Sequence, residues 1–328
     1  MKQSDSIYLG IDIGGTKIAA GLVNGEGEVL YKTRVPMISN RDAATGFSAV
    51  RQAIDTVMAE NPERSMSGIG ICSPGPLDPK TGIVLNPPNL PCWRDFALAD
   101  EVNRAYALPT KVDNDANAAG LAETIWGAAK GYDEVFYATL GTGIGTGIIF
   151  NGRIFHGRTG AAAEGGHMSI DYKGPRCGCG KPGCIEILAS GPAIALRARN
   201  KLKSTGSPSK MMDLASGTID AVTTEMVAAA WRAGDVTATE VLRETADLLT
   251  IWFGNIIDLL EPKIIVVGGG VGELASHWFD HIQQELPKWS INQRCKEIPL
   301  KLARYSADAG LAGAAALCLS GASSAVVA

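Results

Sequence analysis

The hydrophobic pattern predicts short buried strands separated by tight turns, with amphipathic helices between them. The first strand is expected from Ile7 to Ile13, which is mostly apolar and ends at a glycine turn. A second strand follows from Ile18 to Val23. The Asn24-Gly25 dipeptide is typical of a tight hairpin turn, and a third strand is expected from Glu28 to Val35. Apolar residues at helical spacing then predict a helix from Ala44 to Glu60.

The rest of the chain alternates strands and helices in the same way. Further strands are expected at 68–72, 110–113, 135–140, 148–150, 153–156 and 264–267. Further helices are expected at 96–107, 116–126, 191–203, 223–233, 237–260 and 312–320. This alternation predicts the α/β fold class.

One arrangement of elements occurs twice. A strand, a glycine turn, a strand, an Asn-Gly turn and a strand begin at Ile7 and again at Val135. In the second copy the glycine turn is expected over Gly141 to Gly147, and the Asn-Gly turn is Asn151-Gly152. The matching order favours a duplicated domain. An ordinary meander of strands is the alternative reading.

Composition and charge narrow the possible functions. A chain of 328 residues, at ~100–200 residues per domain, predicts two domains or one large unit with two lobes. Hydrophobic residues at 46% and charged residues at 20% exclude a disordered chain, a collagen and a coiled coil. The net charge of -4 disfavours nucleic acid as a partner. Neither a secretory signal nor a long apolar stretch is evident, so we expect a cytoplasmic protein without a membrane partner.

Three glycine turns each follow an apolar strand. They are Gly14-Gly15-Thr16, the run that starts Gly141-Thr142-Gly143, and Gly268-Gly269-Gly270. Glycine lets backbone N–H groups approach an anion closely, so these turns are candidate phosphate sites. None contains the dinucleotide-binding or P-loop pattern, which leaves a nucleotide triphosphate bound in another way. Each turn could also be an ordinary connection.

Asn114 and Asp115 lie at a predicted junction between a strand and a helix. Asp115 is a candidate general base that takes a proton from a substrate hydroxyl, and Asn114 could orient a neighbouring hydroxyl. The alternative is that Asp115 only caps the helix.

One cluster has the spacing of a metal site. His167, Cys177, Cys179 and Cys184 follow the pattern His-x9-Cys-x-Cys-x4-Cys within a loop rich in glycine and proline. Three thiolates and one imidazole suit tetrahedral Zn²⁺, and four protein ligands predict one structural zinc ion. His167 can give one ring nitrogen to zinc and keep the other for a substrate hydroxyl.

Taken together, these motifs resemble the repressor/ORF/kinase (ROK) family of bacterial sugar kinases, within the actin-like, ribonuclease-H-like ATPase superfamily. The resemblance covers nearly the full chain. The matching segments are Asp12 to Lys17, Ser73 to Pro76, Asn114 to Asn117, Leu140 to Gly143, Glu164 to His167, Cys177 to Glu186 and Val267 to Gly270.

The resemblance implies a duplicated fold with two lobes around a cleft. The N-terminal lobe would hold residues 1–117 plus about 308–328, with the last helix packed against it, and the C-terminal lobe 118–307 with the zinc loop. Homodimers or homotetramers would be expected.

The resemblance also implies site residues. ATP phosphates with Mg²⁺ would be bound by two segments, Asp12, Gly14, Gly15, Thr16, Lys17 and Gly141, Thr142, Gly143. The adenosine would lie by Gly268, Gly269, Gly270. Asp115 would be the catalytic base. The sugar would be held by Gly75, Asn89, Asn114, Asp115, Glu164, His167 and Glu186.

The implied activity is ATP-dependent phosphorylation of a hexose at its 6-hydroxyl, with glucose as the expected substrate. N-acetylglucosamine and N-acetylmannosamine kinases share nearly all of these motifs and remain alternatives. A sugar-sensing repressor or a non-catalytic sugar sensor would be a different class of protein. Repressors of the family carry an added N-terminal DNA-binding domain, and the first strand here starts at Ile7.

Overall fold

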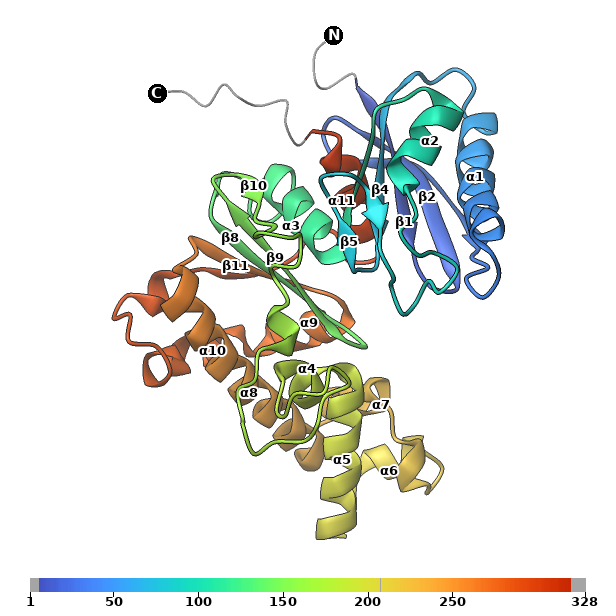
Figure 1. Cartoon of the computed structure of the whole chain (residues 1–328). Helices are drawn as coiled ribbons and strands as arrows, with labels where there is room; N and C mark the ends of the chain where they lie inside the picture. The colour runs from blue at the N-terminus through green and yellow to red at the C-terminus, as the bar shows by residue number, and fades with distance from the viewer. Residues whose placement is uncertain (1–5, 207, 320–328) are drawn as a thin grey trace. The chain divides into compact units, whose positions relative to one another are not determined.

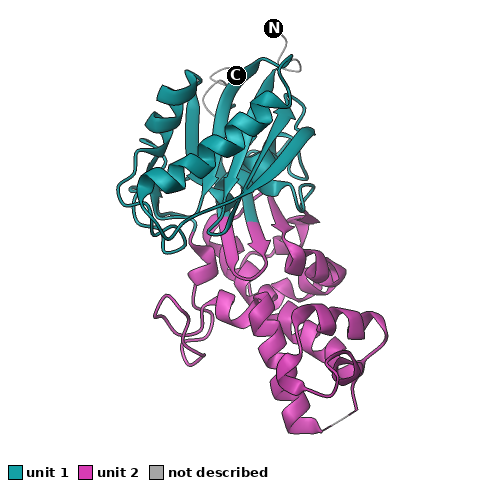
Figure 2. Cartoon of the chain, turned by 90° about the vertical axis from the view of Figure 1, so that its right-hand side faces the viewer, with its two compact units in different colours: residues 1–137, 147–163, 303–328 teal, residues 138–146, 164–302 magenta. Residues whose placement is uncertain are grey.

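The computed structural model describes residues 6–206 and 208–319, which form two compact units (Figure 2). Unit 1 contains residues up to 137, residues 147–163 and the described residues from 303 onward; unit 2 contains 138–146 and 164–302. Residues 118–137 and 147–163 thus belong to unit 1, so the compact units divide the chain differently from the lobes expected above. The lobe boundaries stay a prediction, and their expected end at 328 lies outside the described residues.

The sheet of unit 1 has the strand order β3-β2-β1-β4-β7. Its strands are β1 (Ile7–Ile13), β2 (Lys17–Asn24), β3 (Val29–Pro36), β4 (Met66–Ser73) and β7 (Thr110–Asn114). The first three strands form the expected antiparallel meander, and β1, β4 and β7 are parallel. Two short strands, β5 (Leu77–Asp78) and β6 (Ile83–Val84), pair in the proline-rich segment after β4.

The two faces of β1 meet different helices. Leu9, Ile11 and Ile13 are buried in a core with residues of α1 (Ala43–Ala59) and α2 (Leu98–Tyr106). Alternate residues of a strand point to opposite faces, so Gly10 and Asp12 face the other way. That face is covered by α11 (Ala309–Leu317), drawn in red in Figure 1, and α11 in turn packs against α3 (Asp115–Ile125).

Small residues allow α11 to pack with its backbone against the sheet. A Cβ atom on Gly10 would lie 2.3 Å from the Leu311 carbonyl oxygen, and one on Gly70 would lie 1.7 Å from that of Ala314. On the other side of the helix, a Cβ atom on Gly313 would lie 2.8 Å from backbone atoms of α3. The apolar character of α11 all round is therefore explained by burial on several sides.

The second sheet repeats the order of the first. Its order is β10-β9-β8-β11-β12, with β8 (Val135–Leu140), β9 (Ile144–Phe150), β10 (Arg153–Ile154), β11 (Ile264–Gly268) and β12 (Leu300–Leu302). The first strand of each repeat is central, and its two successors lie on the same side. The predicted glycine turn was too long, because β9 already begins at Ile144. Gly147 lies within this strand, where a Cβ atom would approach the Ala116 carbonyl oxygen to 2.7 Å.

Unit 2 consists mainly of helices. They are α4 (Ile185–Ala189), α5 (Gly191–Thr205), α6 (Lys210–Leu214), α7 (Thr224–Arg232), α8 (Val236–Leu260), α9 (Gly270–Ala275) and α10 (Phe279–Glu285). The hydrophobic pattern predicts α5, α7 and α8 but not the four shorter helices. Within the described residues, no helix is long and apolar enough to cross a membrane.

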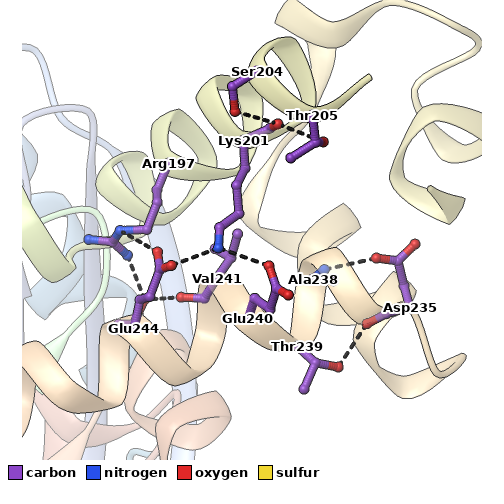
Figure 3. Close-up of polar contacts among 11 residues, drawn as sticks. Arg197, Lys201, Ser204, Thr205, Asp235, Ala238, Thr239, Glu240, Val241 and Glu244 are labelled. Atoms are coloured by element: carbon purple, nitrogen blue, oxygen red, sulfur yellow. Dashed lines mark hydrogen bonds and ion pairs between the residues drawn. The ribbon is translucent and has the colours of Figure 1, made fainter. Parts of the chain in front are cut away.

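Charged side chains connect α5 to α8 (Figure 3). Lys201 forms ion pairs with Glu240 at 2.9 Å and with Glu244 at 2.7 Å. About one helical turn nearer the start of α5, Arg197 Nη1 donates a hydrogen bond to Thr245 Oγ1 at 2.7 Å. Partly exposed ion pairs contribute little to stability, so these contacts mainly fix the register of the two helices.

Replacement of Gly70 by alanine tests the packing of α11. We expect Gly70→Ala to lower the free energy of unfolding by about 3 kcal/mol or more, because the new methyl group would overlap a backbone carbonyl that cannot move alone. Gly68→Ala in the same strand is the matched control, since its Cβ atom would meet its nearest neighbour at 3.2 Å. Urea unfolding of both variants measures the difference. Equal losses in the two variants would contradict this account.

Candidate active site

Unit 1 gathers polar side chains at the carboxyl ends of three neighbouring parallel strands. Asp12 of β1 is in register with Cys72 of β4, and Cys72 is in register with Asp113 of β7. Residues in register share one face of a sheet. The carboxyl ends of parallel strands are also the edge at which open α/β sheets bind ligands.

Asp12 is an acid in a place that disfavours its charge. Burial raises its pKa to about 6, repulsion by Asp115 adds to the rise, and the positive charge of Lys17 opposes it. The carboxylate lies against the start of α11, where a Cβ atom on Gly310 would come within 2.3 Å of Asp12 Oδ2. A divalent cation bound to Asp12 would offset both the cost of burying its negative charge and the repulsion by Asp115. Asp12 therefore fits the Mg²⁺ role that the family resemblance implies.

Asp115 occupies the first turn of α3, and Asn114 is the N-cap. Asn114 Oδ1 accepts hydrogen bonds from the N–H groups of Ala116 and Asn117 at 3.0 and 3.4 Å. The alternative that Asp115 serves as the N-cap is therefore wrong. The surrounding protein raises the pKa of Asp115 by desolvation, against hydrogen bonds from Ala116 N–H and the Asn114 side chain. Its side chain is still exposed, so water moderates the shift and a substrate can reach the carboxylate.

A network next to this junction was missed by the sequence analysis. The buried Asp113 carboxylate contacts His156 Nε2 at 2.6 Å, and it accepts hydrogen bonds from Asn117 Nδ2 at 3.1 Å and from Asn114 N at 2.7 Å. These contacts anchor the backbone on both sides of Asp115. His156 is distant in sequence from Asp113, and no spacing rule connects the two.

The first glycine turn and Asn89 come together in unit 1. The Gly14 N–H donates to the Lys17 carbonyl oxygen at 2.9 Å and closes the turn between β1 and β2. A Cβ atom on Gly15 would lie 2.8 Å from the Asn89 carbonyl oxygen, so only glycine fits there. Thr16 next to it is exposed. Gly75 follows β4 and precedes Pro76.

The second glycine turn, Gly141–Gly143, lies in unit 2 and is called the phosphate turn below. Its Gly141 N–H donates to the Gly143 carbonyl oxygen at 2.9 Å, and the Gly141 carbonyl oxygen accepts from Gly191 N at 2.8 Å. The turn is thus held to the first residue of α5. Backbone N–H groups at such a turn and at a helix start favour an anion.

A pocket of about 580 Å³ opens beside the phosphate turn, which is a size typical of ligand sites. Gly141 and Thr142 of the second glycine turn and Gly270 of the third line it, so these two turns border one pocket. Their roles toward phosphate and adenosine stay predictions. The other lining residues are Gly191, Pro192, Ala195, Arg199, Thr223, Thr224, Glu225, Ala228, Arg232, Val271 and Leu274. The sequence analysis missed its charged residues. Pro192 and the N-cap Thr223 signal the helix starts that border it.

Gly269 packs against the end of β8. Its φ is +80°, and a Cβ atom would lie 2.3 Å from the Leu140 carbonyl oxygen, so both conformation and space require glycine. Gly268 ends β11, and Gly270 begins α9. This tight contact brings the third glycine turn close to the phosphate turn, which starts at the residue after Leu140.

The predicted metal ligands form one cluster in unit 2. The ligand atoms of His167, Cys177, Cys179 and Cys184 all lie within 4.8 Å of one another. Cys177 Sγ is 3.6 Å from His167 Nδ1, and Cys179 Sγ is 3.6 Å from Cys184 Sγ. Ligand atoms around a tetrahedral zinc ion lie roughly 3.5–3.8 Å apart, given Zn–S and Zn–N bonds of about 2.3 and 2.0 Å. The donors therefore fit zinc, with Nδ1 of His167 facing the cluster.

Glu164 and Glu186, the other predicted sugar residues of unit 2, flank this cluster in the chain. The Glu164 carbonyl oxygen accepts from His167 N at 3.0 Å and so closes the short turn between them. Glu186 Oε1 is 3.8 Å from His167 Nδ1. The predicted sites thus divide into two groups, one in each unit.

Comparison with known protein families decides where the chain belongs. The model of the ROK family matches residues 8–320, which is nearly the whole sequence. The chain belongs to the ROK family.

Relatives in the ROK family include sugar kinases of similar length. A glucokinase from Thermotoga maritima is 32% identical over 310 residues, covering 94% of this chain and 96% of the relative. An N-acetylmannosamine kinase from Salmonella typhi is 29% identical over 309 residues, covering 94% and 97%. The crystal structure of a ROK family glucokinase from Streptomyces griseus in complex with glucose and AMPPNP matches with a TM-score of 0.79 and 35% identity, covering 96% of this chain and 100% of that chain. The α/β, actin-like ATPase fold is thereby confirmed.

The burial of Asp12 predicts a pH dependence of stability. Its pKa is about 6 in the folded chain against an ordinary value of 3.8, so its ionisation opposes folding. The stability of the metal-free protein should therefore fall as the pH rises from about 4 to about 6. Asp12→Asn removes this ionisation. Two pKa units correspond to about 3 kcal/mol, and we expect a gain of about 1–2 kcal/mol at pH 7 because asparagine must also be buried.

Urea unfolding of wild type and Asp12→Asn at pH 4, 5, 6 and 7, without divalent cations, measures this effect. Asp42→Asn serves as the control, because the pKa of Asp42 is lowered by the Thr45 N–H at the start of α1 and its ionisation favours folding. That variant should show no gain at pH 7. A stability difference between wild type and Asp12→Asn that is the same at every pH would contradict the prediction.

Proposed function

We propose that this chain is an ATP-dependent glucokinase, which transfers the γ-phosphoryl group of ATP to the 6-hydroxyl of glucose. The observation that carries the proposal is the pocket of about 580 Å³ in unit 2, which is lined by Gly141, Thr142 and Gly270 from two of the three glycine turns that the family resemblance assigns to ATP. Membership of the ROK family and the similarity to glucokinases over nearly the whole chain support it.

In the proposed reaction, Asp115 takes the proton of the 6-hydroxyl as the oxygen attacks the γ-phosphorus and the bond to ADP breaks. A raised pKa suits a general base, because it brings the carboxylate closer to the basicity that proton removal at neutral pH requires. Phosphoryl transfer otherwise needs alignment and neutralisation of charge. Bound Mg²⁺ would supply that neutralisation, and Asp12 is the carboxylate suited to hold it.

The assignment of the sugar contacts is part of the proposal. Asn89 and Asn114 would bind hydroxyl groups from unit 1, and Glu164, His167 and Glu186 from unit 2. His167 Nδ1 faces the cysteines, which leaves Nε2 for a hydroxyl. We also propose one structural Zn²⁺ on His167 and the three cysteines, since four protein donors leave no open position. A homodimer or homotetramer is expected from the family alone.

A panel of sugars tests the proposed function. With Mg²⁺-ATP, coupled ADP-release assays on glucose, mannose, fructose, N-acetylglucosamine and N-acetylmannosamine should give the highest kcat/KM with glucose. The physical reason is that a site built to bind hydroxyl groups discriminates strongly against an analogue that lacks or replaces one. Preference for an N-acetyl sugar would instead indicate the activity of the N-acetylmannosamine kinase relative. No turnover with any sugar would contradict the proposal and favour a sugar sensor.

The role of Asp115 has a separate test. We expect Asp115→Asn to lower kcat by about 10²–10⁴-fold, the usual contribution of a general base. The Kd for glucose should change little, because asparagine keeps the size of the side chain and its hydrogen-bonding oxygen. Calorimetry measures the Kd and the coupled assay measures kcat. If the variant turned over at a rate near that of wild type, Asp115 would not be the base.

A further inference from the structure

Glu186 has contacts that a sugar ligand would not need. Its Oε2 accepts a hydrogen bond from the Ile144 backbone N–H at 3.0 Å, directly after the phosphate turn. Its Oε1 faces the metal cluster, at 3.8 Å from both His167 Nδ1 and Cys177 Sγ. One carboxylate thus lies between two sites of unit 2 that the sequence treats as separate.

The carboxylate lies directly against the phosphate turn. A Cβ atom on Gly143 would be 2.7 Å from Glu186 Oε2, so the absence of a side chain there lets the two approach. The N–H groups that flank the turn are both used within unit 2, that of Gly141 by Gly143 and that of Ile144 by Glu186. A phosphate would therefore be bound by the two residues between them, Thr142 and Gly143. Their orientation depends on the two flanking hydrogen bonds.

The position of Glu186 depends in turn on the cysteine loop. Glu186 is the second residue of α4, two positions after Cys184. Cys184 Sγ donates to the His167 carbonyl oxygen at 3.3 Å, and the next residue, Ile185, donates its N–H to Met168 at 2.9 Å. A metal ion that binds His167 and Cys184 would hold these two segments together and so fix the start of α4.

We propose that Glu186 is a positioning residue that connects the metal site to the phosphate turn, so that the metal ion controls the affinity for nucleotide. This inference rests on the proposed function, because it concerns ATP. A hydrogen bond between a carboxylate and a backbone N–H is stronger than one between neutral groups, so a single contact suffices to hold a short turn of glycines. The metal loop then serves nucleotide binding as well as the sugar.

The test measures the Kd for MgATP by calorimetry, without sugar. Wild type is compared in three states: loaded with zinc, after removal of zinc by a chelator, and after zinc is restored. We expect affinity to fall about tenfold on removal, the effect of one charged hydrogen bond, and to recover on reloading. Zinc content, measured on each sample, confirms the three states.

Variants of Glu186 separate the tether from the metal. In the zinc-loaded protein, Glu186→Ala should weaken MgATP binding about tenfold. Glu186→Gln should stay within about threefold of wild type, because its amide oxygen can still accept from Ile144 N–H. Removal of zinc from Glu186→Ala should then change affinity less than twofold, since the connection is already lost. Glu164→Ala is the matched control: it removes another proposed sugar contact and should leave the Kd for MgATP unchanged.

The outcomes distinguish this inference from the proposed function. If zinc-loaded wild type binds MgATP and Glu186→Ala binds it equally well, the inference is wrong and the glucokinase proposal stands. The same holds if removal of zinc weakens binding to Glu186→Ala as much as to wild type. A zinc-loaded wild type that binds no MgATP would overturn both. If the zinc-free protein unfolds, the inference is tested by the zinc-loaded variants alone. Equal Kd values for MgATP in Glu186→Ala and Glu186→Gln would then overturn it.

Discussion

The burial of acidic side chains at one edge of the first sheet is the constraint on which the site of unit 1 depends. Asp12, Asp113 and Asp115 lie at or just beyond the ends of neighbouring strands, where burial disfavours charge. The Asp113 carboxylate has its hydrogen-bond partners within the protein, because His156, Asn117 and a backbone N–H contact it. Asp12 and Asp115 are left with raised pKa values. Of these three acids, Asp12 is thus the one suited to the proposed cation and Asp115 the one suited to the proposed proton transfer. Their burial lowers the stability of the protein when no ligand is bound.

The second sheet has the same strand order as the first, but the residues around its glycine turn differ in charge. Two residues before the turn after β1 stands an acid, Asp12, whereas the same position before the turn after β8 is Thr139, which carries no charge. The charged residues that line the pocket come from helices α5 and α7, and they are Arg199, Glu225 and Arg232. The duplicated fold therefore supplies two equivalent glycine turns, and the residues around each turn give one an acidic and the other a neutral to basic setting.

The sequence predicted strongly patterned elements well and weakly patterned ones badly. Strand β1 and helix α8 are long enough to show a clear pattern, and their bounds agree with prediction within one residue at each end. Helices α4, α6, α9 and α10 have five to seven residues, too few for a helical period to show. The start of β9 was misplaced because its glycines suggested a turn. Gly147 is required because α3 lies too close to it for a side chain.

Site residues were predictable where one short segment carries the chemistry. The cysteine cluster, the glycine turns and Asp115 are of this kind. The contact of His156 with Asp113 and the charged residues of the pocket depend on tertiary structure that no local pattern encodes.

The difference between Asn114 and Asp115 shows how one junction can serve both folding and chemistry. A side-chain amide has two acceptor positions and two N–H donors. Asn114 Oδ1 uses its acceptor positions on the first N–H groups of α3, and its amide also donates to Asp115. One N–H of Asn114 is then left for the sugar hydroxyl proposed above. Asp115 Oδ1 also accepts from the Ala116 N–H at 2.8 Å, and the residue stays exposed. The Asn114 cap thus fixes the start of α3, where the proposed base lies. Exchanging the two residues would therefore keep a capping side chain at the junction and remove the base from its place.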